Sequence, residues 1–156
     1  AVIIRDDFLA RCKDGNPTMF DFRTHVKNES LYNTPPVFGV YMLKLVLEWI
    51  KSHGGLSAIE KINNEKQSKV YAAMDKHADF YRGTVQKDSR SWMNLTLRLP
   101  SEELEATFLS EAKKSGFVGL KGHRDVGGIR VSLYNAMDIG GVNRLVDFME
   151  SFRRSH

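Results

Sequence analysis

A run of nearly unbroken apolar residues, VFGVYMLKLVLEWI at 37–50, most constrains how this chain can fold. It follows Pro35 and Pro36, which are tolerated in the first turn of a helix, and it precedes Gly54 and Gly55, which favour a helix end. The pattern therefore predicts a helix that is apolar on nearly every face. Because such a helix is stable only when it is covered, we expect it to be buried in something larger than these 156 residues.

The same run is too short and too charged to cross a membrane. Lys44 and Glu48 interrupt it, whereas a membrane span needs about 20 predominantly apolar residues. The first residues, AVIIRDD, lack the basic-then-apolar order of a signal peptide. The single cysteine, Cys12, has no second cysteine with which to form an intramolecular disulfide, which favours a reducing compartment. We therefore expect a cytoplasmic protein with no membrane partner.

Three amphipathic helices are predicted downstream of this run. In each of them, apolar residues recur at the three-to-four-residue spacing that marks one helix face. The first runs from about 57 to 76, and Ser101 and Asp138 are the N-caps expected for the other two. The residues expected to face the core are Ile59, Ile62, Val70, Ala73 and Met74; Leu104, Phe108, Leu109 and Ala112; and Val142, Leu145, Val146, Met149 and Phe152.

Strands are predicted where apolar residues alternate or form short runs. SWMNLTLRL at 91–99 alternates with period two, which indicates a strand with one buried face. Shorter apolar runs predict strands at 2–4, 117–120 and 129–134, whereas residues 5–36 are rich in turn formers. The order of these elements predicts an α+β fold in which a small, largely antiparallel sheet has its helices packed on one face.

The charge balance favours small anionic partners. The chain has a formal net charge of +4 and a pI near 9.2, but its 23 lysines and arginines are interspersed with 19 acidic residues. No region is polycationic, so a small anion fits this pattern better than a nucleic acid does. Nucleic-acid binding is the weakest hypothesis. It predicts an affinity for DNA that falls steeply as the salt concentration rises.

The stretch KGHRDVGGIRVSLYNAM, residues 121–137, gathers cationic side chains around a pair of glycines. Arginine presents a fixed fork of donors that suits carboxylate and phosphate, and paired glycines let backbone N–H groups approach an anion. His123, Arg124 and Arg130 are therefore candidate ligands for two ends of one small anion. The alternative is a solvated hairpin whose cations keep an edge strand soluble.

A second candidate site is the NTPP sequence at the start of the apolar helix. Asn33 and Thr34 stand immediately before the two prolines. Short polar side chains at this position commonly cap a helix, and the same donors near the positive end of the helix dipole can bind a phosphate. The residue types alone leave both roles open.

Other kinds of site lack a sequence signal. The histidines do not show HExxH spacing, no Cys/His set has zinc spacing, and neither a P-loop nor a GxGxxG fingerprint occurs. Cys12 has no partner arrangement that marks it as a nucleophile. We therefore expect no metal site and no nucleotide-binding loop.

Taken together, SLYNTPPVFGVYMLKLVLEWIKSHGG, RSWMNLTLRL and LKGHRDVGGIRVSLYNAM, followed by GVNRLVDFMESF, resemble the phosphoserine aminotransferase family. These are pyridoxal 5'-phosphate (PLP) enzymes of fold type I, class V, and the resemblance covers essentially the whole chain. It implies that residues 1–45 are the tail of the large PLP-binding domain and the start of a linking helix. Residues 46–156 would then be the C-terminal small domain.

The resemblance also implies roles for the candidate residues. In similar proteins, the residues that match Asn33 and Thr34 reach the PLP phosphate of the neighbouring subunit, which implies a homodimer. The residues that match His123 and Arg124 belong to the pocket for the substrate's phosphate, and the one that matches Arg130 pairs with the substrate's α-carboxylate. These roles agree with the chemistry that the side chains offer.

The implied reaction is reversible amino transfer between glutamate and 3-phosphohydroxypyruvate, which gives O-phosphoserine and 2-oxoglutarate. The family's Schiff-base lysine should lie upstream of Ala1, and no lysine of this chain matches it. We therefore expect the chain alone to be catalytically inactive, as a C-terminal portion of the enzyme. The alternative is a stand-alone anion-binding or interaction module with the small-domain fold and no catalysis.

Overall fold

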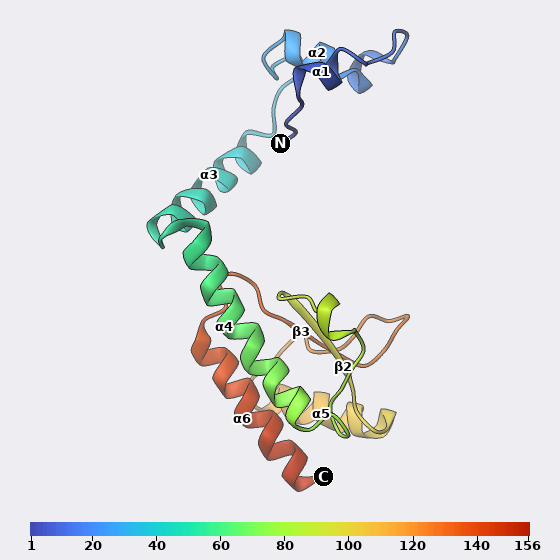
Figure 1. Cartoon of the computed structure of the whole chain (residues 1–156), viewed down its shortest axis with the longest axis vertical. Helices are drawn as coiled ribbons and strands as arrows, with labels where there is room; N and C mark the ends of the chain where they lie inside the picture. Colours follow the sequence, from blue (N-terminus) through green and yellow to red (C-terminus); the bar gives the residue numbers. More distant parts are fainter. The chain divides into compact units, whose positions relative to one another are not determined.

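The structure, a computed structural model, describes all residues from 1 to 156, and the chain divides into two compact units (Figure 1). Unit 1 is Ala1–Trp49 and unit 2 is Ile50–His156. The domain boundary expected after residue 45 stays a prediction. The elements of unit 1 are α1 (Asp6–Leu9), η1 (Thr18–Phe20), α2 (Phe22–Lys27) and most of α3 (Val37–Ser52).

Unit 2 contains a three-stranded sheet and the three predicted amphipathic helices. Both predicted N-caps are confirmed, because Ser101 Oγ accepts from the backbone N–H of Leu104 at 3.2 Å and Asp138 Oδ1 accepts from that of Gly141 at 2.8 Å. The elements of unit 2 are α4 (Gly55–Lys76), β1 (Arg82–Gly83), η2 (Lys87–Ser89), β2 (Asn94–Arg98), α5 (Glu102–Lys114), β3 (Ile129–Ser132) and α6 (Ile139–Ser155).

The sheet has the order β1-β2-β3, and both of its pairings are antiparallel, as predicted. Thr96 of β2 lies opposite Arg130 of β3, which fixes the register of the central pair. In β1, Arg82 pairs with Arg98. The sequence did not predict β1, because a two-residue Arg-Gly strand shows no alternation of apolar residues.

Two of the predicted strands are wrong. Residues 2–4 are not a strand, because every strand of the chain belongs to the sheet of unit 2 and this run has no neighbouring strand in unit 1. Residues 117–120 form no strand either, and only a single bridge between Lys121 and Ile129 adds to β3 there. Gly116 and Gly119 have φ angles of 87° and 75°, so the backbone bends instead of extending.

One buried cluster joins the inward face of the sheet to α4, α5 and α6. The alternation in β2 and β3 places their apolar residues on this side. Helices α4 and α6 lie side by side (Figure 1). The α+β fold with helices against a small antiparallel sheet is thus confirmed. The most fully buried members include Val70, Met74, Tyr81, Leu95, Leu97, Phe108, Ile129, Val142 and Met149.

One predicted core position on α4 is wrong. Ile62 is 41% exposed, whereas Asn63 and Lys66 are buried. The inner face of α4 accepts these polar side chains because both bond to the loop before α6. Asn63 Nδ2 donates to Asn135 Oδ1 at 2.8 Å, and Lys66 Nζ donates to the carbonyl oxygen of Tyr134 at 2.9 Å.

Helix α3 confirms the helix predicted from the apolar run. It begins directly after Pro36 and ends at Ser52, before Gly54 and Gly55, which have φ angles of 93° and 76°. None of its residues is buried. No helix of the chain is both long and apolar enough to span a bilayer. Its exposed apolar residues include Val37, Phe38, Val40, Tyr41, Leu43, Val46 and Leu47.

Candidate functional site

The hairpin that leads into β3 carries three of the predicted site residues. Its two arms are joined by hydrogen bonds from Gly122 N to Gly128 O and from Arg130 N to the carbonyl oxygen of Leu120, both at 2.8 Å. We call its tip, residues 123–127, the 123–127 loop. The loop contains His123 and Arg124, and Arg130 follows within β3. All three side chains are exposed.

The backbone of the 123–127 loop closes on itself through His123. The carbonyl oxygen of His123 accepts from Val126 N at 3.0 Å and from Gly127 N at 2.7 Å. Its ring nitrogen Nδ1 accepts from Asp125 N at 3.3 Å. In the neutral imidazole this arrangement leaves the proton on Nε2, which can then donate to an external anion.

Arg124 is free to bind a ligand. Its side chain is 90% exposed, and its one charged neighbour is Asp125, with Nε 3.6 Å from Oδ1. An exposed pair at this distance contributes little to stability, so it does not commit the guanidinium. The fork of donors on Arg124 therefore remains available for a phosphate or carboxylate.

Two glycines of the hairpin, Gly122 and Gly128, are required because neighbouring atoms leave no room for a Cβ at either position. A Cβ on Gly122 would overlap the carbonyl oxygen of Gly127. Gly128 has a φ of 73°, and a Cβ there would lie 2.7 Å from Arg98 Cδ. The tight geometry fits both interpretations of this sequence, the anion site and the solvated basic hairpin. The exposed cations decide what the hairpin can bind, and the glycines decide its shape.

Arg130 lines a cavity of about 580 Å³ beside β3. The cavity is walled by the bend at 116–120, by the residues that follow β3 and by the first turns of α6. No ion pair or side-chain hydrogen bond engages the guanidinium of Arg130, so it can pair with a small carboxylate that enters this cavity. Other residues that line the cavity are Leu133, Tyr134, Met137 and Arg144.

Asn33 and Thr34 lie in unit 1. Both are exposed, and Asn33 Nδ2 donates to the carbonyl oxygen of Thr34 at 3.2 Å. Neither side chain caps α3. The first backbone hydrogen bond of the helix runs from Val40 N to the carbonyl oxygen of Pro36 at 3.0 Å. The hydroxyl of Thr34 and the remaining amide donor of Asn33 are a donor set that suits a phosphate.

Sequence reasoning missed Lys66, which is fully buried and bonds to Tyr134 and Met137, two residues that line the Arg130 cavity. Its Nζ donates to the carbonyl oxygens of Tyr134, Asn135 and Met137 at 2.9, 3.4 and 3.1 Å. A signal was present, because Lys66 falls at helical spacing from Ile59 and the other buried residues of α4. A lysine at such a position is normally assigned to the solvent, so the spacing alone was not decisive.

Comparisons with known proteins identify relatives along almost the whole chain. The model of the family described as Aminotransferase class-V matches residues 3–145. A phosphoserine aminotransferase of Geobacillus kaustophilus is 54% identical over 153 residues, which cover 98% of this chain and 42% of the relative. One from Niallia circulans is 53% identical over 154 residues, with 99% and 42% covered. The chain thus spans about two fifths of the length of these relatives.

Solved structures give the same result. A phosphoserine aminotransferase from Bacillus circulans subsp. alkalophilus superposes with a TM-score of 0.91 at 52% identity, over 97% of this chain and 42% of that one. A PLP-bound phosphoserine aminotransferase from Trichomonas vaginalis superposes with a TM-score of 0.84 at 36% identity, over 94% and 42%. The similarity therefore extends through both units of the chain.

Proposed function

Because this chain belongs to the aminotransferase class-V family, we propose that it forms the C-terminal portion of a phosphoserine aminotransferase. The proposed reaction transfers an amino group between glutamate and 3-phosphohydroxypyruvate, giving O-phosphoserine and 2-oxoglutarate. The observation that carries the proposal is the hairpin of unit 2. It presents exposed, uncommitted cations at two places, Arg124 at the tip and Arg130 in β3.

Each cation suits one end of a phosphorylated amino acid. Arg124 supplies a guanidinium fork for the phosphate, and His123 adds a donor through Nε2. Arg130 pairs with the α-carboxylate, which requires a fixed cation beside a cavity. Because the backbone hydrogen bonds of the hairpin join its arms, the backbone positions from which the two side chains extend are set before the substrate arrives, and less backbone entropy is lost on binding.

Asn33 and Thr34 suit the phosphate of PLP. They offer an amide and a hydroxyl before α3, and neither is used to cap that helix. When bound, PLP draws electrons away from the carbon that carries the substrate's amino group. We assign these two residues to the cofactor of a neighbouring subunit in a homodimer. On this basis, residues 1–45 end the large domain and residues 46–156 form the small domain of a cytoplasmic enzyme.

The lysine that attaches PLP is proposed to lie outside these 156 residues. The chain alone then binds and orients substrate but transfers no amino group. Determining the coding sequence upstream of Ala1 tests this assignment directly. A continuous upstream reading frame that carries a lysine of this kind supports it, whereas a start codon at the beginning of this segment favours a stand-alone anion-binding module.

The activity is tested by incubating the enzyme that contains this segment with glutamate and 3-phosphohydroxypyruvate and measuring 2-oxoglutarate. Hydroxypyruvate without its phosphate is the matched control substrate. Because loss of a charge-assisted contact costs about 1.5 to 3 kcal/mol, we expect kcat/KM for this control to be lower by roughly tenfold to a hundredfold. No 2-oxoglutarate, or equal rates for the two keto acids, would contradict the proposal.

A further inference from the structure

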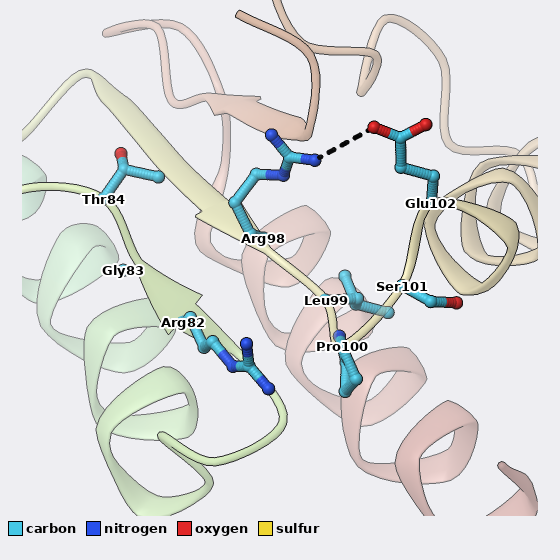
Figure 2. A pocket seen from close by; sticks show the side chains of 8 residues that line it. All are labelled: Arg82, Gly83, Thr84, Arg98, Leu99, Pro100, Ser101 and Glu102. Atoms are coloured by element: carbon cyan, nitrogen blue, oxygen red, sulfur yellow. Dashed lines mark ion pairs between the residues drawn. The ribbon is translucent and has the colours of Figure 1, made fainter.

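Arg98, at the end of β2, connects the 123–127 loop to helix α5. Its Nε donates to Glu105 Oε1 at 2.6 Å, and its Nη1 donates to the carbonyl oxygen of Val126 at 3.2 Å. Its Nη2 lies 3.8 Å from Glu102 Oε1, the ion pair drawn in Figure 2. One planar group therefore contacts the first turns of α5 on one side and the loop on the other.

The α5 end of this connection is rigid. Glu105 is 6% exposed, and the oxygen that accepts from Arg98 also accepts from the backbone N–H of Leu99 at 3.1 Å. A buried carboxylate with two donors has little freedom to move, and its hydrogen bond to a guanidinium is charge-assisted. Glu105 therefore fixes the guanidinium of Arg98. The fixed guanidinium in turn holds the loop in place through its hydrogen bond to Val126.

The loop end of the connection depends on contact with Arg98. The amides of Val126 and Gly127 bond within the loop, to the carbonyl of His123, and give it no attachment to the rest of unit 2. The carbonyl of Val126 makes that attachment through Arg98. Gly127 and Gly128 lie so close to the arginine side chain that an added Cβ would stand 3.6 Å from Nη1 or 2.7 Å from Cδ.

Arg98 is not itself arranged to bind substrate. All three of its guanidinium nitrogens already face oxygen atoms of the protein. It lines a cavity of about 360 Å³ with Arg82, but Figure 2 shows the two arginine side chains extending away from each other. The geometry therefore suits a side chain that holds other groups in place.

We propose that Arg98 is a positioning residue that fixes the 123–127 loop against α5 and thereby sets the enzyme's affinity for the phosphate of its substrate. This inference rests on the proposed function, in which His123 and Arg124 bind that phosphate. Without the contact from Arg98, the loop keeps its own turn and the hydrogen bonds between the arms of the hairpin, but its tip loses the bond that fixes it against α5. The backbone that carries Arg124 then samples more positions, and ordering it costs affinity on binding.

The test uses Arg98→Lys in the enzyme that contains this segment. Lysine keeps a positive charge beside Glu105, but a single ammonium does not reproduce the planar fork that contacts Glu105 and Val126 together. The second variant, Arg98→Gln, removes the positive charge as well as the fork. The matched control is Arg90→Lys, because Arg90 makes a similar forked pair with Asp75, at 2.8 and 2.6 Å, and stacks on Tyr71.

Two readouts separate positioning from general destabilisation. We expect the KM for O-phosphoserine to rise about tenfold in Arg98→Lys while the KM for glutamate changes less than about threefold. We also expect amide hydrogen exchange in residues 121–128 to become faster, while exchange in α4 and α6 is unchanged. Arg90→Lys should alter neither the ratio of the two KM values nor exchange in the hairpin.

Several outcomes would overturn the positioning role. These are equal increases in both KM values, unchanged exchange in the hairpin, or the same exchange pattern in Arg90→Lys. If the wild-type enzyme does not act on O-phosphoserine, the proposed function fails. Hydrogen exchange in the hairpin then still decides whether Arg98 fixes the loop, and titration with inorganic phosphate decides whether this affects anion affinity. Unaltered phosphate affinity in both Arg98 variants would also reject the inference.

Discussion

Lys66 Nζ lies 2.9 Å from the carbonyl oxygen of Tyr134, and this bond joins the middle of α4 to the loop before α6. The lysine is completely buried, and the carbonyls of Asn135 and Met137 accept from the same ammonium. Burial lowers the pKa of Lys66, since it disfavours the charged form. The three carbonyls offset this cost, so the loop and the lysine stabilise each other.

Replacement of this ammonium should destabilise unit 2. Lys66→Met keeps most of the side-chain length but removes the ammonium donor from all three carbonyl oxygens, and only that of Tyr134 keeps a second bond, from Met137 N at 2.9 Å. We expect the free energy of unfolding to fall by about 2 to 4 kcal/mol. Urea unfolding followed by circular dichroism measures this change. Lys61→Met, at an exposed position on the same helix, should leave the midpoint nearly unchanged, and equal midpoints for the two variants would contradict a role for the buried contacts.

The carboxylate of Glu150 makes the stability of unit 2 depend on pH in the acid range. Lys76 donates a hydrogen bond to its carboxylate at 2.7 Å, and His77 donates another at 3.0 Å. These two bonds, of which that from Lys76 has the larger effect, lower the pKa of Glu150 from 4.5 to about 2. Because the pKa is lower in the folded state, this stabilisation is fully present above the unfolded value of 4.5. It is lost as the pH falls from there towards about 2.

Glu150→Gln should remove that part of the acid dependence. We expect its free energy of unfolding to vary less than that of the wild type as the pH falls from 4.5 to about 2. Urea unfolding at a series of pH values measures the slope for each protein. Glu65→Gln, an exposed change on α4, is the control and should follow the wild type. Parallel curves for the wild type and Glu150→Gln would show that this carboxylate is not the source of the acid dependence.

Arg124 and Arg130 should be separable by kinetics, because they are assigned to different ends of the substrate. In the enzyme that contains this segment, Arg130→Ala should raise KM for both the amino acid and the keto acid. Arg124→Ala should weaken only phosphorylated substrates, by roughly tenfold to a hundredfold. Steady-state kinetics with glutamate and O-phosphoserine measure both effects. An equal loss for the two amino acids in Arg124→Ala would reject its assignment to the phosphate.

Local signals predicted the parts of the fold that depend on neighbouring residues. Ser101 and Asp138 were identified as caps because a capping side chain bonds to a backbone amide within the same turn. The ends of α3 followed from its prolines and glycines, and β2 followed from its alternation. The cations of the hairpin were also visible in the sequence, since GHRDVGGIR is short and continuous.

The missed features depend on partners that are distant in the sequence. Lys66 is buried because it bonds to carbonyls of residues 134–137, and nothing within α4 indicates those partners. Arg98 resembles an ordinary polar residue of an alternating strand, although it bonds to Val126 far along the chain. The strand wrongly predicted at residues 117–120 is different, because the reason is local: Gly116 and Gly119 have positive φ angles that bend the backbone.

Asn33 and Thr34 should affect the binding of PLP and leave the hairpin of unit 2 unchanged. In the enzyme that contains this segment, changing both residues to alanine removes an amide and a hydroxyl donor. We expect the affinity for PLP to fall about tenfold or more. Titration of the apoenzyme with PLP, followed by absorbance, measures the affinity without relying on turnover. An unchanged dissociation constant would reject the assignment to the cofactor's phosphate.

Helix α3 should make the 156-residue chain self-associate when it is produced alone. It presents Val40 and Leu47 at 57% and 55% exposure, one above the other along the same helix face. An apolar surface of this kind is unfavourable in water and drives association. Sedimentation velocity should therefore give a mass above 17.8 kDa, and Val40→Lys with Leu47→Lys should shift the chain towards the monomer. A wild-type chain that sediments as a monomer and binds no apolar dye would show that this surface is covered within the chain.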